Sequence, residues 1–187
     1  MKVVMAENIG FCFGVDRAYK MSLDLLKKGD CQMLGHLVHN ERVVEELGSK
    51  GLRFVASVDE IGPGTVIVRA HGVGDETMER IRATGCEIAD ATCPLVRRAQ
   101  DFARSLEREG KKVVIIGERG HAEVEAINGS IGGRAVIIES EDEIDRIPEG
   151  VPLGIVIQTT KDRLLADGVV EAVKARFNDV EAFNTLC

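Results

Sequence analysis

Short apolar runs rich in β-branched residues alternate with segments of helical periodicity along most of this chain. Such alternation, with short loops between the segments, is typical of parallel sheets whose strands are joined by crossover helices. The runs show little alternation of polar and apolar residues, which favours strands that are buried on both faces. The sequence therefore predicts an α/β fold with parallel sheets.

The positions of these runs, and of the residues that interrupt them, predict the individual elements. Strands are expected at residues 2–6, 32–34, 52–56, 65–69, 87–91, 112–116, 135–139, 153–157 and 180–183. Helices are expected at residues 15–28, 41–47, 75–83, 94–110, 141–147 and 162–177, and a further short helix begins at residue 121. Pro94 stands in the first turn of its helix, where a missing N–H costs nothing.

One short motif occurs twice and divides the chain into two similar units. Residues 12–18 and 93–99 both read C-x-x-V-x-R-A, and each motif opens a helix. Cys187 follows another strand-like run and would open a third unit. We therefore expect one α/β unit at residues 1–93, with Cys12 and Cys93 at its edges, and a second at residues 94–187. No linker rich in Pro, Gly or Ser separates them, so we expect the units to pack closely.

Composition argues against several classes of function. A net charge of −7 without a large basic cluster argues against a nucleic-acid surface, and six Phe, one Tyr and no Trp argue against stacking platforms. The longest apolar runs are far shorter than the roughly 20 residues that a membrane span needs. The N-terminus carries no apolar stretch of the secretory type. We expect a cytoplasmic protein that binds neither nucleic acid nor membrane.

The cysteines are the first candidates for chemistry. Five cysteines in a reducing compartment do not form a disulfide framework, so metal binding or catalysis is the better interpretation. Cys12 and Cys93 each precede a helix, whose N-terminus favours the thiolate that a soft metal or an iron-sulfur cluster needs. A buried cysteine that acts as a small hydrophobe is the alternative. For Cys31 and Cys86, which lack the motif, we prefer that alternative.

Other polar residues also follow the expected strands. They are Cys12, His39, His71, Cys93, His121, Glu123, Thr159 and Thr160. In open parallel sheets, ligands bind in the crevice beyond the carboxyl ends of the strands, so these residues can converge on one site.

Each of these polar residues also has an ordinary structural interpretation. The three loop histidines can bind phosphate oxygens, pass protons or ligate a metal, but a single loop histidine is more often solvated. Glu123 can serve as a general acid if it lies in a cavity, or can stabilise a helix N-terminus. Thr159 and Thr160 can equally be helix caps. His36 has no counterpart elsewhere in the chain and remains unassigned.

Six motifs occur in a fixed order along the chain. They are GFCFGVDRA at 10–18, VHN at 38–40, RAHGV at 69–73, DATCPLV at 90–96, GHAEVE at 120–125 and QTT at 158–160. In this order the motifs closely resemble those of the 4-hydroxy-3-methylbut-2-enyl diphosphate reductases, the last enzymes of the methylerythritol phosphate route to isoprenoids. The resemblance extends from one end of the chain to the other.

The resemblance implies a specific site and chemistry. Cys12, Cys93 and Cys187 would be the three ligands of a 4Fe-4S cluster. The cluster's iron without a cysteine ligand would bind the substrate's hydroxyl oxygen. That hydroxyl would leave as water after the addition of two electrons and protons, giving isopentenyl and dimethylallyl diphosphate. The remaining assignments would be diphosphate binding by His39, His71 and His121, proton delivery by Glu123, and placement of substrate and protons by Thr159 and Thr160. The electron donor would be a small carrier such as ferredoxin or flavodoxin.

The resemblance also implies an incomplete architecture. Family members continue past the third cysteine into another α/β unit, so we expect two similar parallel-sheet units of a pseudo-threefold, three-unit architecture whose third unit is absent. The chain would be an incomplete form of the enzyme or one part of a split enzyme. The alternative hypotheses are a non-catalytic module in which the cysteines hold zinc, and a fragment that binds diphosphates without redox chemistry.

Overall fold

The computed structural model describes residues 3–4, 9–38 and 40–187. Most of the expected strand at 2–6, and the candidate ligand His39, lie outside the described residues. Within that expected strand, Val3 and Val4 are described, and they are exposed and not part of a strand. The structure therefore gives no support for a strand at these two residues.

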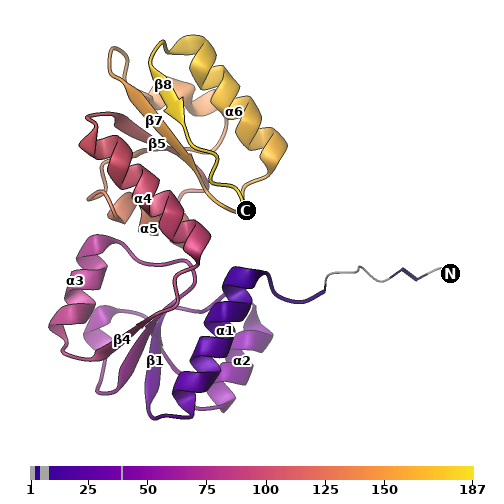
Figure 1. Cartoon of the computed structure of the whole chain (residues 1–187), viewed down its shortest axis with the longest axis vertical. Helices are drawn as coiled ribbons and strands as arrows, with labels where there is room; N and C mark the ends of the chain where they lie inside the picture. The colour runs from indigo at the N-terminus through magenta and orange to yellow at the C-terminus, as the bar shows by residue number, and fades with distance from the viewer. Residues whose placement is uncertain (1–2, 5–8, 39) are drawn as a thin grey trace.

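Strands and helices alternate from the first described helix to the last strand (Figure 1). The first half contains α1 Phe13–Leu26, β1 Cys31–Leu34, α2 Glu41–Ser49, β2 Arg53–Val55, η1 Val58–Glu60, β3 Thr65–Val68, α3 Asp75–Ala83 and β4 Glu87–Asp90. The second half contains α4 Pro94–Arg108, β5 Lys112–Ile116, α5 Ala122–Gly129, β6 Val136–Ile138, η2 Glu141–Arg146, β7 Leu153–Ile157, α6 Arg163–Arg176 and β8 Val180–Ala182.

The strands form two four-stranded sheets with the same topology. Their orders are β2-β1-β3-β4 and β6-β5-β7-β8, and every pair of neighbouring strands is parallel. The second sheet thus repeats the first, strand for strand. In Figure 1 the first sheet and its helices form the lower lobe, and the second sheet with α4, α5 and α6 forms the upper lobe.

Helices cover both faces of the first sheet. Successive side chains of a strand point to opposite faces, so Ile67 of β3 packs with residues of α1 and α2, whereas Val66 and Val68 pack with α3 and η1. All three side chains are fully buried. This two-sided burial explains the continuous apolar character of the strand sequences.

The second sheet is covered in the same way. Val113 and Ile115 pack with α4 and α5, and Val114 and Ile116 pack with η2 and α6. The predicted α/β class with parallel sheets buried on both faces is therefore confirmed. No helix in the described part of the chain is long and apolar enough to cross a membrane.

One predicted helix has a different form. The expected helix at 141–147 is a 3₁₀ helix, Glu141–Arg146. The segment is short and Pro148 follows it closely, so there is little room to propagate an α-helix beyond its nucleus. Short segments of this kind commonly adopt 3₁₀ geometry. The sequence analysis also missed the 3₁₀ turn Val58–Glu60.

Candidate functional site

The duplicated motif places two cysteines at the starts of α1 and α4. Cys12 is the residue before α1 and Cys93 is the residue before α4, both in extended backbone conformations. The motif's alanines, Ala18 and Ala99, are fully buried, which explains why a small residue recurs there. The repeated sequence therefore fixes two helices against their sheets and leaves each cysteine at a helix N-terminus.

The two helix starts meet at the junction of the lobes. A Cβ built on Gly14 would overlap Cys93 Sγ and would lie 3.1 Å from Cys93 Cβ. Gly14 is therefore required for the close approach of α1 to Cys93. Arg17, also on α1, donates from Nη1 to the carbonyl of Thr92 at 3.3 Å and holds the same junction.

Cys187 occupies the place in the second unit that Cys93 occupies in the first. The Cys93 N–H donates to the carbonyl of Ala70 at 2.9 Å, and the Cys187 N–H donates to the carbonyl of Thr159 at 3.0 Å. Ala70 and Thr159 are each the second residue after the third strand of their sheet. The backbone after β8 is held as well, because the Thr185 hydroxyl accepts from the Ile157 N–H at 2.8 Å.

The pKa of the Cys187 thiol is raised by its surroundings. Partial burial of the thiol raises its pKa most, and Cys12, Glu123 and Cys93, in that order, raise the pKa further through their negative charges. Cys12, Cys93 and Glu123 thus lie near enough to the Cys187 thiol to act on its charge. In Figure 1 the C-terminus lies beside the starts of α1 and α4.

Glu123 is a buried carboxyl at the start of α5. Its side chain is 1% exposed, and it accepts hydrogen bonds from the Thr159 N–H at 2.6 Å and the Thr159 hydroxyl at 2.9 Å. Burial raises the pKa of this carboxyl, and the two bonds from Thr159 oppose the rise without cancelling it. A carboxyl with a raised pKa holds its proton more tightly than an ordinary glutamate and is a candidate proton donor.

Two histidines stand beside this carboxyl. His121 precedes α5, and its Nδ1 accepts from the Glu123 N–H at 3.1 Å, so the neutral ring carries its proton on Nε2. The rings of His71 and His121 lie edge to face with their centroids 5.4 Å apart. The loops after β3 and β5 therefore bring one imidazole from each sheet to the junction.

The remaining candidates lie at the edge of this region or away from it. The Thr160 hydroxyl is exposed to solvent and accepts from Gln158 Nε2 at 3.0 Å. Cys31 begins β1 and Cys86 precedes β4, so both lie at the amino ends of strands, away from the loops of the other cysteines. The thiols of Cys31 and Cys86 donate to the carbonyls of Gly29 at 3.5 Å and Gly62 at 3.1 Å.

The three cysteines at the junction are better candidates for ligands of an iron-sulfur cluster than Cys31 and Cys86 are. Cys12, Cys93 and Cys187 supply soft sulfur ligands, and the first two stand at helix N-termini. Within 9–38 and 40–187, these three thiols are not arranged as a group that could hold a metal ion, so the fit to a cluster rests on the kind of ligand and not on the spacing of the sulfur atoms.

Two residues beside the site, Arg69 and Gln158, were not predicted from the sequence. Arg69 and Gln158 are each the first residue after the third strand of their sheet. Gln158 is buried, and its Oε1 accepts from the Glu118 N–H at 2.9 Å. Arg69 lies in the motif RAHGV and Gln158 in the motif QTT. Their equivalent positions, at the end of a predicted strand or directly after it, were the signal in the sequence that could have identified them.

Comparison with known proteins identifies the family. A family model described as LytB protein matches residues 3–187. This chain belongs to the LytB family. The 4-hydroxy-3-methylbut-2-enyl diphosphate reductase of Syntrophotalea carbinolica is 37% identical over the whole chain, which covers 68% of that relative. The enzyme of the same name from Geotalea uraniireducens is 35% identical, and the chain covers 67% of it.

Solved structures of LytB relatives share the fold. A structure of (E)-4-hydroxy-3-methyl-but-2-enyl diphosphate reductase, described as the terminal enzyme of the non-mevalonate pathway, matches with a TM-score of 0.87 at 34% identity. The match covers 99% of this chain and 68% of that one. The corresponding reductase from Plasmodium falciparum matches with a TM-score of 0.90 at 26% identity, over 95% of this chain and 58% of that one. The chain thus spans about two thirds of its enzyme relatives.

Proposed function

We propose that this LytB chain carries the cluster ligands and part of the substrate site of a 4-hydroxy-3-methylbut-2-enyl diphosphate reductase. The reaction adds two electrons and two protons to the substrate, breaks the bond between carbon and the hydroxyl oxygen, and releases water with isopentenyl or dimethylallyl diphosphate. The observation that carries the proposal is the convergence of Cys12, Cys93, Cys187 and Glu123 at one junction. The names of the relatives support the same reaction.

The proposal assigns a 4Fe-4S cluster to the three cysteines of the junction. When bound, such a cluster supplies electrons and a Lewis-acidic iron that assists departure of the hydroxyl. The two lobes then contribute Cys93 and Cys187 in the same manner, each from the segment that follows the last strand of its sheet. We propose a boundary between the two units near Cys93, and a ferredoxin or flavodoxin in the cytoplasm as the electron donor.

The proposal gives the protein's own groups separate tasks. Glu123 holds a proton in a buried, bonded position and passes it toward the departing hydroxyl, while Thr159 fixes both carboxyl oxygens. His71 and His121 stand together and supply donors for the diphosphate. His39, for which the resemblance implies the same task, and Thr160 remain proposed substrate ligands.

Anaerobic reconstitution of the 187-residue chain with iron and sulfide tests the assignment. We expect broad visible absorbance and bound iron in the native sequence, and the loss of both in Cys93→Ala. Cys86→Ala is the matched control, because its thiol lies at the opposite end of a strand, and it should retain the absorbance. A colourless chain with tightly bound zinc, or equal absorbance in Cys93→Ala, would contradict the proposal.

A further inference from the structure

The two sheets place equivalent crevices at their carboxyl ends. In the orders β2-β1-β3-β4 and β6-β5-β7-β8, the connections reverse direction between β1 and β3 and between β5 and β7. Ligands of open parallel sheets bind at such reversal points. Each point contains a glycine directly after the first strand of the sheet and a polar residue directly after the third. These are Gly35 with Arg69, and Gly117 with Gln158.

At the second reversal point, the polar side chain has hydrogen-bond partners within the protein. A Cβ on Gly117 would lie 3.0 Å from both Cβ and Oε1 of Gln158, so the glutamine side chain fills the space beside the glycine. Gln158 Oε1 accepts from the Glu118 N–H, and Gln158 Nε2 donates to Thr160. The polar atoms of this side chain therefore have partners within the protein.

The first reversal point has the same pairing of residues, but its polar side chain lacks such partners among the described residues, and Gly35 has a φ of +71° that Gly117 does not share. A Cβ on Gly35 would lie 2.5 Å from Nη1 of Arg69, so the guanidinium lies against the glycine backbone. The Arg69 Nε is buried without a hydrogen-bond partner. Across 9–38 and 40–187, no carboxylate forms an ion pair with Arg69. Burial lowers the pKa of the guanidinium, because the charged form is less well solvated there.

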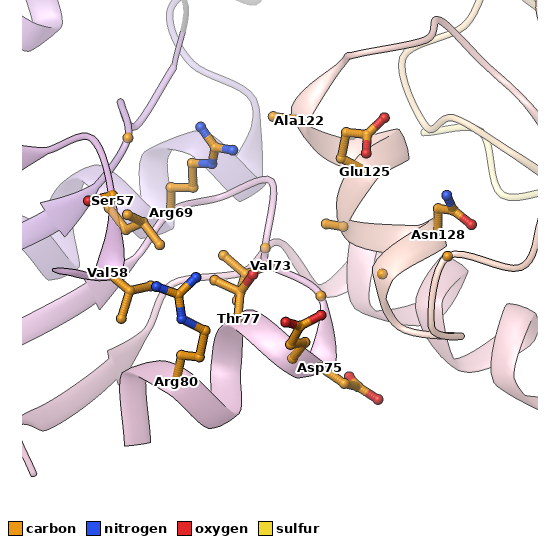
Figure 2. Close-up of a pocket in the computed structure, with 18 of the residues that line it drawn as sticks. Ser57, Val58, Arg69, Val73, Asp75, Thr77, Arg80, Ala122, Glu125 and Asn128 are labelled. Carbon is orange, nitrogen blue, oxygen red and sulfur yellow. The ribbon is translucent and has the colours of Figure 1, made fainter. Parts of the chain in front are cut away.

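A cavity of about 680 Å³ lies beside this guanidinium. It runs between the first sheet and α5, and Arg69 lines it from the first lobe while Glu125 and Asn128 line it from the second. Figure 2 shows Arg69 and Glu125 projecting from opposite walls. Asn128 Oδ1 accepts from the Ala135 N–H at 3.0 Å, which leaves the amide's NH₂ as the group for a ligand. Neither the cysteines nor His71 and His121 line this cavity.

We propose that Arg69 anchors a phosphate-binding site in the cavity between the two lobes, separate from the site of the cysteines. A planar guanidinium matches the oxygens of a phosphate group through paired hydrogen bonds, and an arginine without an acidic partner retains all its charge for such a ligand. Arg80, which also lines the cavity, pairs with Asp59 at 2.8 Å and is not part of the site. The ligand is a phosphate or diphosphate group.

The opposite wall sets a condition on this site. Glu125 is exposed and lines the cavity, so it repels an anion that approaches α5. On the first lobe's side, Asp75 and Glu76 of α3 also line the cavity, and Asp75 pairs with Arg104, so the phosphate is placed against Arg69 at the end of β3 and away from α3. Substitutions at the two walls should therefore change the phosphate affinity in opposite directions. Loss of Arg69 weakens binding, and loss of the Glu125 charge strengthens it.

Titration of the 187-residue chain with inorganic phosphate, and separately with inorganic diphosphate, tests the site. The readout is the backbone amide resonance of Gly35, and the amide of Gly120 beside His121 reports any binding at the other site. We expect a saturable shift at Gly35 with at least one of the two anions. Arg69→Met should weaken the affinity on the order of tenfold or more, because a charged hydrogen-bond pair is lost. Arg80→Gln, the matched control, should change the affinity less than about twofold, because its charge is already paired.

Two further measurements make the result decisive. Glu125→Gln should tighten phosphate binding, whereas weaker binding in that variant would show that Glu125 does not repel the anion and would contradict the charge arrangement of the proposed site. Phosphate should raise the thermal midpoint of the native chain, because the ligand binds the folded state and not the unfolded state. It should not raise the midpoint of Arg69→Met, which lacks the anchor of the site. If Arg69→Met fails to fold, Arg69→Lys, which keeps the charge and loses the planar fork, should show an affinity below that of the native chain. No shift at Gly35 with either anion, or equal affinity in the Arg69 variant, would refute the site.

Discussion

The carboxyl ends of the two sheets share one backbone plan and differ in their chemistry. In both, the glycine after the first strand donates its N–H to the neighbouring strand, Gly35 to Val55 at 2.8 Å and Gly117 to Ile138 at 3.0 Å. In the second unit, the side chain of Gln158 beside this glycine is hydrogen-bonded to Glu118 and Thr160. In the first, the Arg69 guanidinium is not paired with any carboxylate in the described part of the chain. The repeated topology thus places a side chain at the same position in each unit. The type of residue there decides whether the side chain stabilises the fold, as Gln158 does, or is available to a ligand, as Arg69 is.

The largest expected effect concerns the bonded network of the second unit. Glu123→Gln keeps the size of the side chain and the hydrogen bonds that Thr159 can make, but removes the transferable proton. In a chain joined to the further unit that its relatives carry, we expect turnover to fall on the order of a hundredfold or more, with the visible absorbance of the cluster unchanged. Product formation from 4-hydroxy-3-methylbut-2-enyl diphosphate with a chemical reductant measures the effect. Turnover at the native rate would remove Glu123 from the proton path.

The next effect concerns the side chain that fills the second reversal point. Gln158→Ala leaves the Glu118 N–H and the Thr160 hydroxyl without their partner and opens a space beside Gly117. We expect a loss of about 2 kcal/mol in the free energy of unfolding. Urea denaturation measures it, and a loss below about 0.5 kcal/mol would show that the network does not stabilise the second unit.

The corresponding change in the first unit should have the opposite sign. Arg69→Gln gives the first reversal point the residue type of the second and removes a desolvated charge that has no anionic partner. In buffer without phosphate we expect the free energy of unfolding to rise by about 1 kcal/mol. If Arg69→Gln instead destabilises the chain as Gln158→Ala does, the contrast between the two units is wrong.

The smallest effect is a pH dependence of stability. The pKa of Glu123 is raised in the folded chain, so its ionisation costs stability as pH rises from the ordinary glutamate pKa of about 4.3 through the raised value. Below that window the carboxyl is protonated in both states and the cost disappears. Glu123→Gln should therefore gain stability over the native chain at neutral pH and lose that gain in acid. Urea denaturation at several pH values measures the difference, and a gain independent of pH would contradict the assigned shift.

Much of the fold could be predicted because each element carries its own local signal. Strand Lys112–Ile116 and helix Asp75–Ala83 have the predicted bounds, since a β-branched run marks the strand and the glycines Gly74 and Gly85 stand on either side of the helix. The class of the fold followed from the alternation of these elements. The 3₁₀ form of Glu141–Arg146 could not be predicted, because its periodicity resembles that of a short α-helix.

The site was only partly predictable for a physical reason. Residues such as His71 and Thr159 stood out because polar side chains after buried strands are informative about function. The bonds between Thr159 and Glu123 join residues 36 positions apart and depend on the packing of α5 against the loop after β7. Arg69 was quoted only as part of a motif, because the absence of a partner is a property of three-dimensional packing and leaves no local pattern.

The claim that the two units deliver equivalent cysteines to one junction is tested most directly by the iron content of Cys187→Ala after anaerobic reconstitution. The hydrogen bonds of Cys93 to Ala70 and of Cys187 to Thr159 make the two cysteines equivalent, so we expect this variant to lose its cluster as completely as Cys93→Ala. The Cys31→Ala control should keep the native content of iron and sulfide. Retention of a full cluster in Cys187→Ala would contradict the equivalence of the units.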